Sequence, residues 1–203
     1  MLEEKVFEKY ESIYNNIFSL FYPALESNGF TERNLTVNFS KAYEQTYCND
    51  RIFSWFELPL LGNKNNEHFD CIIVNVDRKE VFFVEAKRYP SVKSKKESSK
   101  GDIIRIEDYI KKYFYKDPRF ENYSDYKLYG LILADVWQEN TSKVKLYNSF
   151  VNEEFFDDVD ELNNKKPQYK TIRFNYIDAL GNRNKPLLGS EQEYDLLVFW
   201  WEI

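Results

Sequence analysis

Cysteine, histidine and glycine are scarce in this sequence of 203 residues. The two cysteines, Cys48 and Cys71, are too few for the disulfide framework of a small secreted domain. The single histidine, His68, argues against histidine-rich metal sites and weakens any Ser-His or Cys-His triad. Six glycines, with neither GxxxxGK(S/T) nor GxGxxG, argue against a phosphate-cradling loop. Any catalytic chemistry is therefore expected to rest on carboxylates and lysines.

Long apolar runs are also absent. No run approaches the roughly 20 residues needed to cross a bilayer, and the acidic start, residues 1–5, is unlike the basic start of a signal peptide. The chain is nevertheless 43% hydrophobic, which is enough to bury a core without a metal or disulfide staple. We expect one soluble, cytoplasmic domain over residues 1–203, with no membrane partner.

Aromatic side chains, in contrast, are abundant at 18%, and hydrophobic patterning predicts a series of short elements. Residues 30–50 are ambiguous, although the alternation of Leu35, Val37 and Phe39 indicates a strand. The clearer patterns predict helices over 3–26 and 102–116, a polar loop over 90–101, and strands over 51–60, 68–76, 80–89, 126–137, 169–177 and 194–202.

The order of these elements predicts an α/β fold with a central mixed sheet flanked by helices. A short polar turn separates the strands over 68–76 and 80–89, which is typical of an antiparallel hairpin. A helix then separates the second of these strands from the strand over 126–137, and such a crossover joins parallel strands.

A candidate site lies at the end of the hairpin. The pattern (D/E)xK occurs four times, and three of the matches fall in a helix, in a polar turn and ahead of a strand. Only Glu85 and Lys87 close an apolar strand, where period-two geometry places both on the face of Val81 and Phe83. Antiparallel pairing brings Asp70, near the start of the preceding strand, close to that end. An ion-paired strand end without chemistry is the alternative interpretation.

Two carboxylates and an ammonium in one pocket have a definite chemical use. Carboxylates concentrate negative charge and suit a hard divalent cation. An ammonium beside that cation can orient a water molecule or stabilise the charge that develops on a phosphoryl oxygen.

This arrangement resembles the PD-(D/E)xK nuclease superfamily, whose shared core has the order helix, strand, strand, strand, helix, strand. Phe69 stands where the family motif has proline. The resemblance implies a restriction endonuclease-like core over about 3–137, with residues 138–203 as a C-terminal extension of the sheet that carries additional strands.

The resemblance also implies the chemistry. Asp70, Glu85 and the backbone carbonyl of Ala86 would bind Mg²⁺ (or Mn²⁺), and Lys87 would act on the attacking water. The implied function is a metal-dependent nuclease, a hydrolase of phosphodiester bonds, acting on DNA rather than RNA. The alternative is a catalytically inactive nuclease-like fold that serves as a binding or assembly module. The sequence leaves open whether the protein forms a homodimer or binds a partner protein.

Many members of the superfamily add another acid, for which two positions compete. Glu57 lies in the middle of an apolar strand, where an unpaired carboxylate would be costly, and is preferred. Glu11, or Glu8, on the first helix is the other choice. A solvent-facing Glu57 at a sheet edge is the alternative interpretation.

Positive charge gathers directly after the candidate site. Residues 86–116 carry a net charge of +6, while the rest of the chain carries −12, for a total of −6. A nucleic-acid backbone would pass here, although a solvated lysine-rich loop explains the pattern equally well. The residues expected to bind nucleic acid are Lys93, Lys95, Lys96, Lys100 and Arg105.

Overall fold

The computed structural model describes residues 2–20, 31–61, 67–88, 92–138, 159, 162, 165, 167–175 and 193–203. Its elements, in chain order, are α1 (Glu4–Leu20), α2 (Glu32–Thr46), β1 (Ile52–Pro59), β2 (His68–Asn75), β3 (Glu80–Arg88), α3 (Val92–Lys112), η1 (Phe114–Lys116), η2 (Pro118–Tyr123), β4 (Lys127–Gln138), β5 (Gln168–Asn175) and β6 (Glu193–Glu202). Among the described helices, none is long and apolar enough to span a bilayer.

The strands form one mixed sheet in the order β1-β2-β3-β4-β6-β5. The first three strands pair antiparallel, and β3 and β4 pair parallel after the α3 crossover. The predicted hairpin and the predicted parallel pair are both confirmed. Strand β6 inserts between β4 and β5 and is antiparallel to each of them, so the C-terminal strands extend the same sheet.

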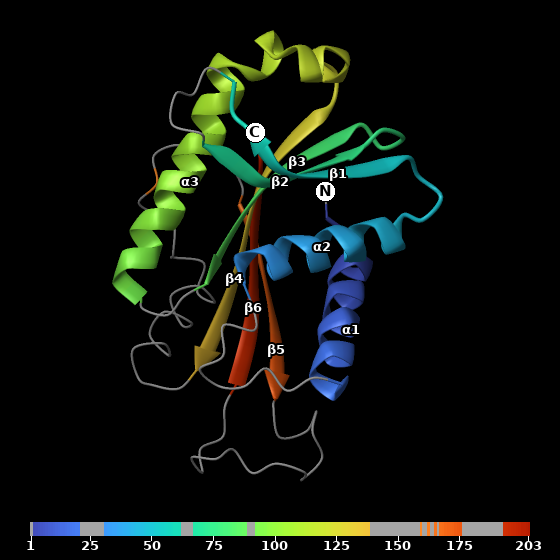
Figure 1. Ribbon diagram of the computed structural model, residues 1–203, viewed down its shortest axis with the longest axis vertical. Coiled ribbons are helices and arrows are strands. Elements are labelled where there is room, and N and C mark those ends of the chain that lie inside the picture. The colour runs from blue at the N-terminus through green and yellow to red at the C-terminus, as the bar shows by residue number, and fades with distance from the viewer. Residues whose placement is uncertain are drawn as a thin grey trace.

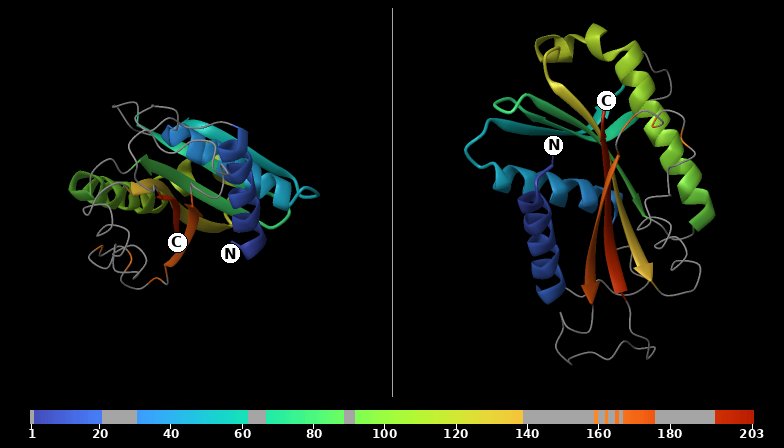
Figure 2. Two further views of the ribbon diagram at one scale, coloured as in Figure 1. Left: turned by 90° about the horizontal axis from the view of Figure 1, so that it is seen from below. Right: turned by 180° about the vertical axis from the view of Figure 1, so that it is seen from behind.

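Helices cover both faces of the sheet. Figures 1 and 2 show α3 along one face and α1 and α2 on the other. Each face has its own hydrophobic core, and β3 alternates between them: Phe82 and Val84 join the α1/α2 side, while Val81 and Phe83 join the α3 side. Period-two geometry therefore directs Glu85 and Lys87, at the end of β3, toward α3.

Within residues 30–50, Glu32–Thr46 form the helix α2, and the strand indicated there is wrong. The buried positions Leu35, Phe39, Ala42 and Tyr43 follow helical spacing, whereas Val37 lies exposed on the opposite side of α2. Thr31 and Asn34 form a capping box that starts the helix. Leu35 and Phe39 lie on the buried face of this helix, and the exposed Val37 between them produced the strand-like alternation.

Helix α3 begins at Val92, so the loop predicted over 90–101 is also wrong from 92 onward. Lysine and serine are compatible with the exposed face of a helix. Ser99, Ile103 and Ile106 are buried and form its inner face. Helix α1 is confirmed over 4–20, and the rest of its predicted span, 21–26, lies outside the described residues.

Candidate active site

The hairpin brings Asp70 and Glu85 together. The β2–β3 register ends at Cys71 opposite Val84, and Asp70 and Glu85 are the next residues of the two strands beyond that pair. Oδ2 of Asp70 accepts a hydrogen bond from the backbone N–H of Ala86 at 2.8 Å. The Glu85 side chain is 1% exposed. The two acids predicted from sequence to converge therefore meet at the carboxyl end of β3.

An irregularity in β1 and β2 accompanies this arrangement. Alternate side chains of a strand share a face, yet Phe56 packs on the α1/α2 side and Leu58 on the α3 side. Glu57, between them, has a φ of 54° and is passed over in the β1–β2 register, opposite Asp70. At Glu57, therefore, the alternate side chains of β1 change from one face of the sheet to the other. The Asp70 carboxylate, in turn, binds the N–H of Ala86 where the regular β2–β3 ladder has stopped.

Helix α3 supplies two partners: Asp102, which the sequence analysis did not single out, and Arg105, which was expected to bind nucleic acid. Asp102 Oδ2 lies 2.9 Å from the Lys87 ammonium. The Arg105 guanidinium lies 2.6 Å from Glu85 Oε1 and 3.0 Å from Asp102 Oδ1. Asp102 and Arg105 are three residues apart on one helix face, a spacing readable in the sequence. Which strand that face covers is decided by the tertiary structure.

These contacts set the charge states of the site. Burial raises the pKa of Glu85 well above its usual range, the nearby Asp70 raises it further, and Arg105 opposes both. Burial works to lower the pKa of Lys87, but the negative charges of Asp102, Glu85 and Glu32 together outweigh it, so the net shift is upward. Lys87 is therefore a charged hydrogen-bond donor at neutral pH and not a proton acceptor.

The pKa of Asp102 is raised by burial, against the lowering effect of Lys87 and Arg105. Two of the buried carboxylate oxygens, Glu85 Oε1 and Asp102 Oδ2, have a cation nearby but no well-directed hydrogen bond. The Nε of Arg105 is likewise buried without a hydrogen-bond acceptor. These two carboxylate oxygens can therefore still accept hydrogen bonds.

Asp70 and Glu85 are oxygen donors of the type that Mg²⁺ takes. Mg²⁺ uses one or two protein carboxylates and retains several waters. Asp70 and Glu85 provide two carboxylates, and Oε1 of Glu85 accepts no hydrogen bond. Within the described residues, no group of three or more His, Cys, Asp or Glu side chains is arranged to hold a metal. A closed cage of the calcium or zinc type is therefore not present in that part of the chain.

The remaining acids predicted as ligands lie elsewhere. The Glu57 side chain is 58% exposed and pairs with Arg33 at 3.5 Å, so the argument that it is buried in mid-strand is wrong and the solvent-facing interpretation describes it. Glu11 and Glu8 are exposed on α1, the helix that covers the opposite face of the sheet. None of the three joins Asp70 and Glu85 in a described three-acid group.

The basic segment is helical and only partly described. The side chains of Lys93, Lys95 and Lys96 lie outside the described residues. Lys100 is half-buried on α3. Arg105 faces Glu85 and Asp102 instead of solvent, so its charge is already engaged within the protein. His68 is exposed at the start of β2.

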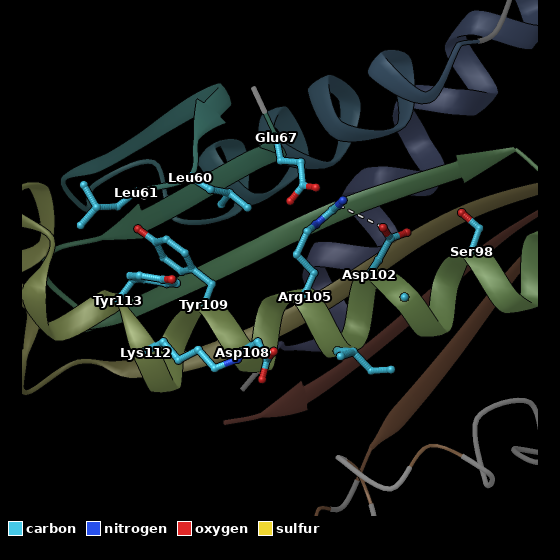
Figure 3. A pocket seen from close by; sticks show the side chains of 12 residues that line it. Leu60, Leu61, Glu67, Ser98, Asp102, Arg105, Asp108, Tyr109, Lys112 and Tyr113 are labelled. Atoms are coloured by element: carbon cyan, nitrogen blue, oxygen red, sulfur yellow. Dashed lines mark hydrogen bonds and ion pairs between the residues drawn. The ribbon is translucent and has the colours of Figure 1, made fainter. Parts of the chain in front are cut away.

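An open pocket of about 620 Å³ adjoins the cluster along α3. Figure 3 shows its walls: Asp102 and Arg105 line it from α3 and Tyr113 from the turn that follows, while Leu60, just after β1, and Glu67, just before β2, face them. The pocket and the ion-paired cluster share Asp102 and Arg105, so a ligand in the pocket would lie directly beside the acidic site.

A second buried charged group lies on the other face of the sheet. Asp135, opposite Arg88 in the β3–β4 register, accepts a hydrogen bond from the Tyr194 hydroxyl at 3.2 Å and lies 3.6 Å from Arg88 Nε. The backbone N–H of Arg88 donates to Glu32 at 3.1 Å. Burial raises the pKa of Asp135 to about 6, against the lowering effect of Arg88.

Comparisons with known proteins add no relative: no family model, no curated protein and no solved structure matches this chain.

Proposed function

We propose that this chain is a Mg²⁺-dependent nuclease that hydrolyses phosphodiester bonds, with DNA as substrate rather than RNA. The observation that carries the proposal is the convergence of Asp70 and Glu85 at the carboxyl end of β3, with Lys87 two residues beyond Glu85 on the same strand. The choice of DNA over RNA rests on the resemblance to the PD-(D/E)xK nucleases.

The order of elements supports the same proposal. A helix precedes an antiparallel run of three strands, and a crossover helix leads to a fourth strand parallel to the third. This order corresponds to the core of a restriction endonuclease-like fold. Helix α2 and the strands β5 and β6 would be additions to that core.

Each residue of the site has a role that follows from its surroundings. Asp70 and Glu85, with the carbonyl of Ala86, would hold the magnesium ion. When bound, the ion lowers the pKa of a coordinated water and offsets charge on the phosphoryl group. Lys87, kept charged by Asp102, would donate a hydrogen bond that orients the attacking water or stabilises a phosphoryl oxygen. Arg105 balances the buried charge of Glu85.

One observation favours a second candidate, a binding or assembly module without turnover. Lys87 and Arg105 are both paired with acids inside the protein, as they would be in a cluster that only locks α3 onto β3. Removal of one partner from such a buried cluster would destabilise the fold. A catalytic role instead predicts a loss of activity that exceeds any loss of stability.

The test compares two lysines that share the same sequence pattern. Lys87→Ala should lower the rate of Mg²⁺- or Mn²⁺-dependent DNA cleavage by about 100-fold or more, the range for loss of one positioned catalytic donor. Lys79→Ala is the control, because Asp77–Lys79 also matches (D/E)xK but Lys79 is an exposed turn residue paired with Asp125. Undiminished cleavage by Lys87→Ala would remove Lys87 from the mechanism.

Metal binding separates the two candidates. Millimolar Mg²⁺ or Mn²⁺ should raise the melting temperature of the wild-type protein by mass action, and Asp70→Asn should lose most of that response. A metal response without cleavage of any DNA would favour the binding module. Absence of both a metal response and cleavage would contradict the nuclease.

A further inference from the structure

The pocket beside α3 differs in chemistry from the acidic site that it adjoins. One end carries Asp102 and Arg105, whereas the other end is formed by apolar and aromatic side chains (Figure 3). Leu61 and Tyr113 belong to this apolar part, and both are among the exposed large hydrophobic residues of the described chain. Its volume of about 620 Å³ lies within the range of sites that enclose small organic groups.

The cations that line the pocket are already neutralised. Arg105 pairs with Asp102 at 3.0 Å and with Glu85 at 2.6 Å. Lys112 pairs with Asp108 at 2.7 Å, and both of these residues line the pocket. Because these positive charges have partners, the lining offers little to a phosphate. Leu60, Leu61, Tyr109 and Tyr113 add an apolar, aromatic wall beside the charged residues.

Tyr113 forms the exposed part of that wall. Its side chain is 39% exposed, and its ring centroid lies 6.1 Å from that of Tyr109 at an interplanar angle of 36°. Tyr109 is held in place, because its hydroxyl donates to Asp117 at 2.6 Å and its ring packs edge-on against Phe69 at 5.1 Å. An exposed ring supported by an ordered ring is a suitable platform for a flat aromatic group.

We propose that this pocket holds an unpaired nucleobase of single-stranded DNA next to the scissile phosphate, with the base stacked on Tyr113. This inference rests on the proposed nuclease function and adds its substrate class. A base within a duplex is paired and stacked, so it presents only its edges and the backbone, whereas a base in a single strand can leave the strand and lie on an aromatic platform. The substrate would therefore be single-stranded DNA or a frayed end.

The test measures binding in EDTA, so that no cleavage occurs. Fluorescence anisotropy with a labelled single strand should show that Tyr113→Ala weakens binding by about 5- to 100-fold, the loss caused by removal of one stacked base. Tyr113→Phe keeps the ring and should retain the affinity. Tyr115→Ala is the matched control, because Tyr115 is 65% exposed nearby but does not line the pocket.

Two further probes identify the group that is bound. A duplex of the same sequence should bind with the same affinity to wild type and to Tyr113→Ala. A single strand with abasic sites keeps its phosphates and should bind wild type as weakly as the intact strand binds Tyr113→Ala. Equal losses for single strand and duplex, or tight binding of the abasic strand, would overturn the proposal.

Failure of this inference can be distinguished from failure of the nuclease proposal. If wild type cleaves DNA with Mg²⁺ but Tyr113→Ala binds single strands normally, the base pocket is wrong and the nuclease stands. If single-strand binding depends on the Tyr113 ring but no metal produces cleavage, the pocket stands and the nuclease is wrong.

Discussion

At the scale of single residues, the (D/E)xK pattern occurs in two different environments. Glu85 and Lys87 end a strand that is buried on both faces, so each charge needs a partner inside the protein, and α3 provides Arg105 and Asp102. Asp77 and Lys79 have the same spacing but lie in an exposed turn. Burial, and not spacing, makes one pair a candidate for chemistry.

A buried acid on the other face predicts a pH dependence of stability. Burial raises the pKa of Asp135 from 3.8 to about 6, so between these values the folded protein retains a proton that the unfolded chain has lost. Stability should therefore fall as pH rises through this window. Asp135→Asn should reduce that fall and raise the free energy of unfolding at pH 7 by up to about 3 kcal/mol, with little change at pH 4.

Urea or thermal unfolding at several pH values between 4 and 7 measures this effect. Some slope should remain in Asp135→Asn, because the pKa of Glu85 is shifted in the same direction. Asp125→Asn is the control of opposite sign: Asp125 is an exposed partner of Lys79, which lowers its pKa, so its loss should slightly destabilise the protein at pH 7. A variant Asp135→Asn that is less stable at pH 7 would contradict the prediction.

At the scale of elements, the contact between β4 and β6 is unusually close. Gly130 on β4 lies opposite Trp201 on β6, and the Trp201 indole occupies the space where a Cβ of residue 130 would be. The same indole N–H donates to the buried carboxylate of Glu107 on α3 at 2.7 Å. One tryptophan thus links two strands and the helix that carries Asp102 and Arg105.

Gly130→Ala should destabilise the protein. Its Cβ would lie 2.0 Å from Trp201 Cζ2, so the indole must move and strain its bond to Glu107. Overpacking of this kind costs about 1–3 kcal/mol, which corresponds to a decrease in melting temperature of about 2–12 °C for a chain of this length. Thermal unfolding by circular dichroism measures the difference.

Gly101→Ala is the matched control for this change. A Cβ at Gly101, in the interior of α3, would meet nothing within 4 Å. Alanine is a better helix former than glycine by about 0.5–1 kcal/mol, so this variant should be as stable as wild type or more so. Equal melting temperatures for both glycine variants would show that the Trp201 contact is not tight.

At the scale of the whole molecule, the C-terminal strand is part of the central sheet. Strand β6 pairs with β4 from Glu193 to Glu202 and contributes alternate side chains to both cores: Leu196, Val198 and Trp200 to the α1/α2 side, and Leu197, Phe199 and Trp201 to the α3 side. The C-terminal extension therefore supports β4, the strand that lies parallel to β3.

A fragment that ends at Gln138 should consequently not fold. Loss of β6 would expose both cores and leave the full length of β4 as an unpaired edge, which favours aggregation. Near-ultraviolet circular dichroism and size-exclusion chromatography should show lost tertiary packing and association, whereas the full chain gives a cooperative unfolding transition. A monomeric fragment with a cooperative transition would show that residues 3–137 are an independent core.

Local sequence patterns determined several features of this protein. Apolar runs bounded by polar turns located the strands that became β1, β2 and β3, and period-two geometry placed Glu85 and Lys87 on one face. The short turn and the helical crossover predicted the antiparallel hairpin and the parallel pair. Each depends on neighbours in the chain, because alternation, turns and crossover lengths are local properties.

Only the tertiary structure decided the rest. Residues 32–46 alternate like a strand in part, but packing against α1 and the sheet selects a helix. Glu57 looks buried among apolar neighbours, yet a positive φ turns the strand over and leaves its carboxylate in solvent. Asp102 and Arg105 reach Lys87 and Glu85 because α3 crosses that end of β3. These outcomes depend on pairings distant in sequence, which local periodicity does not encode.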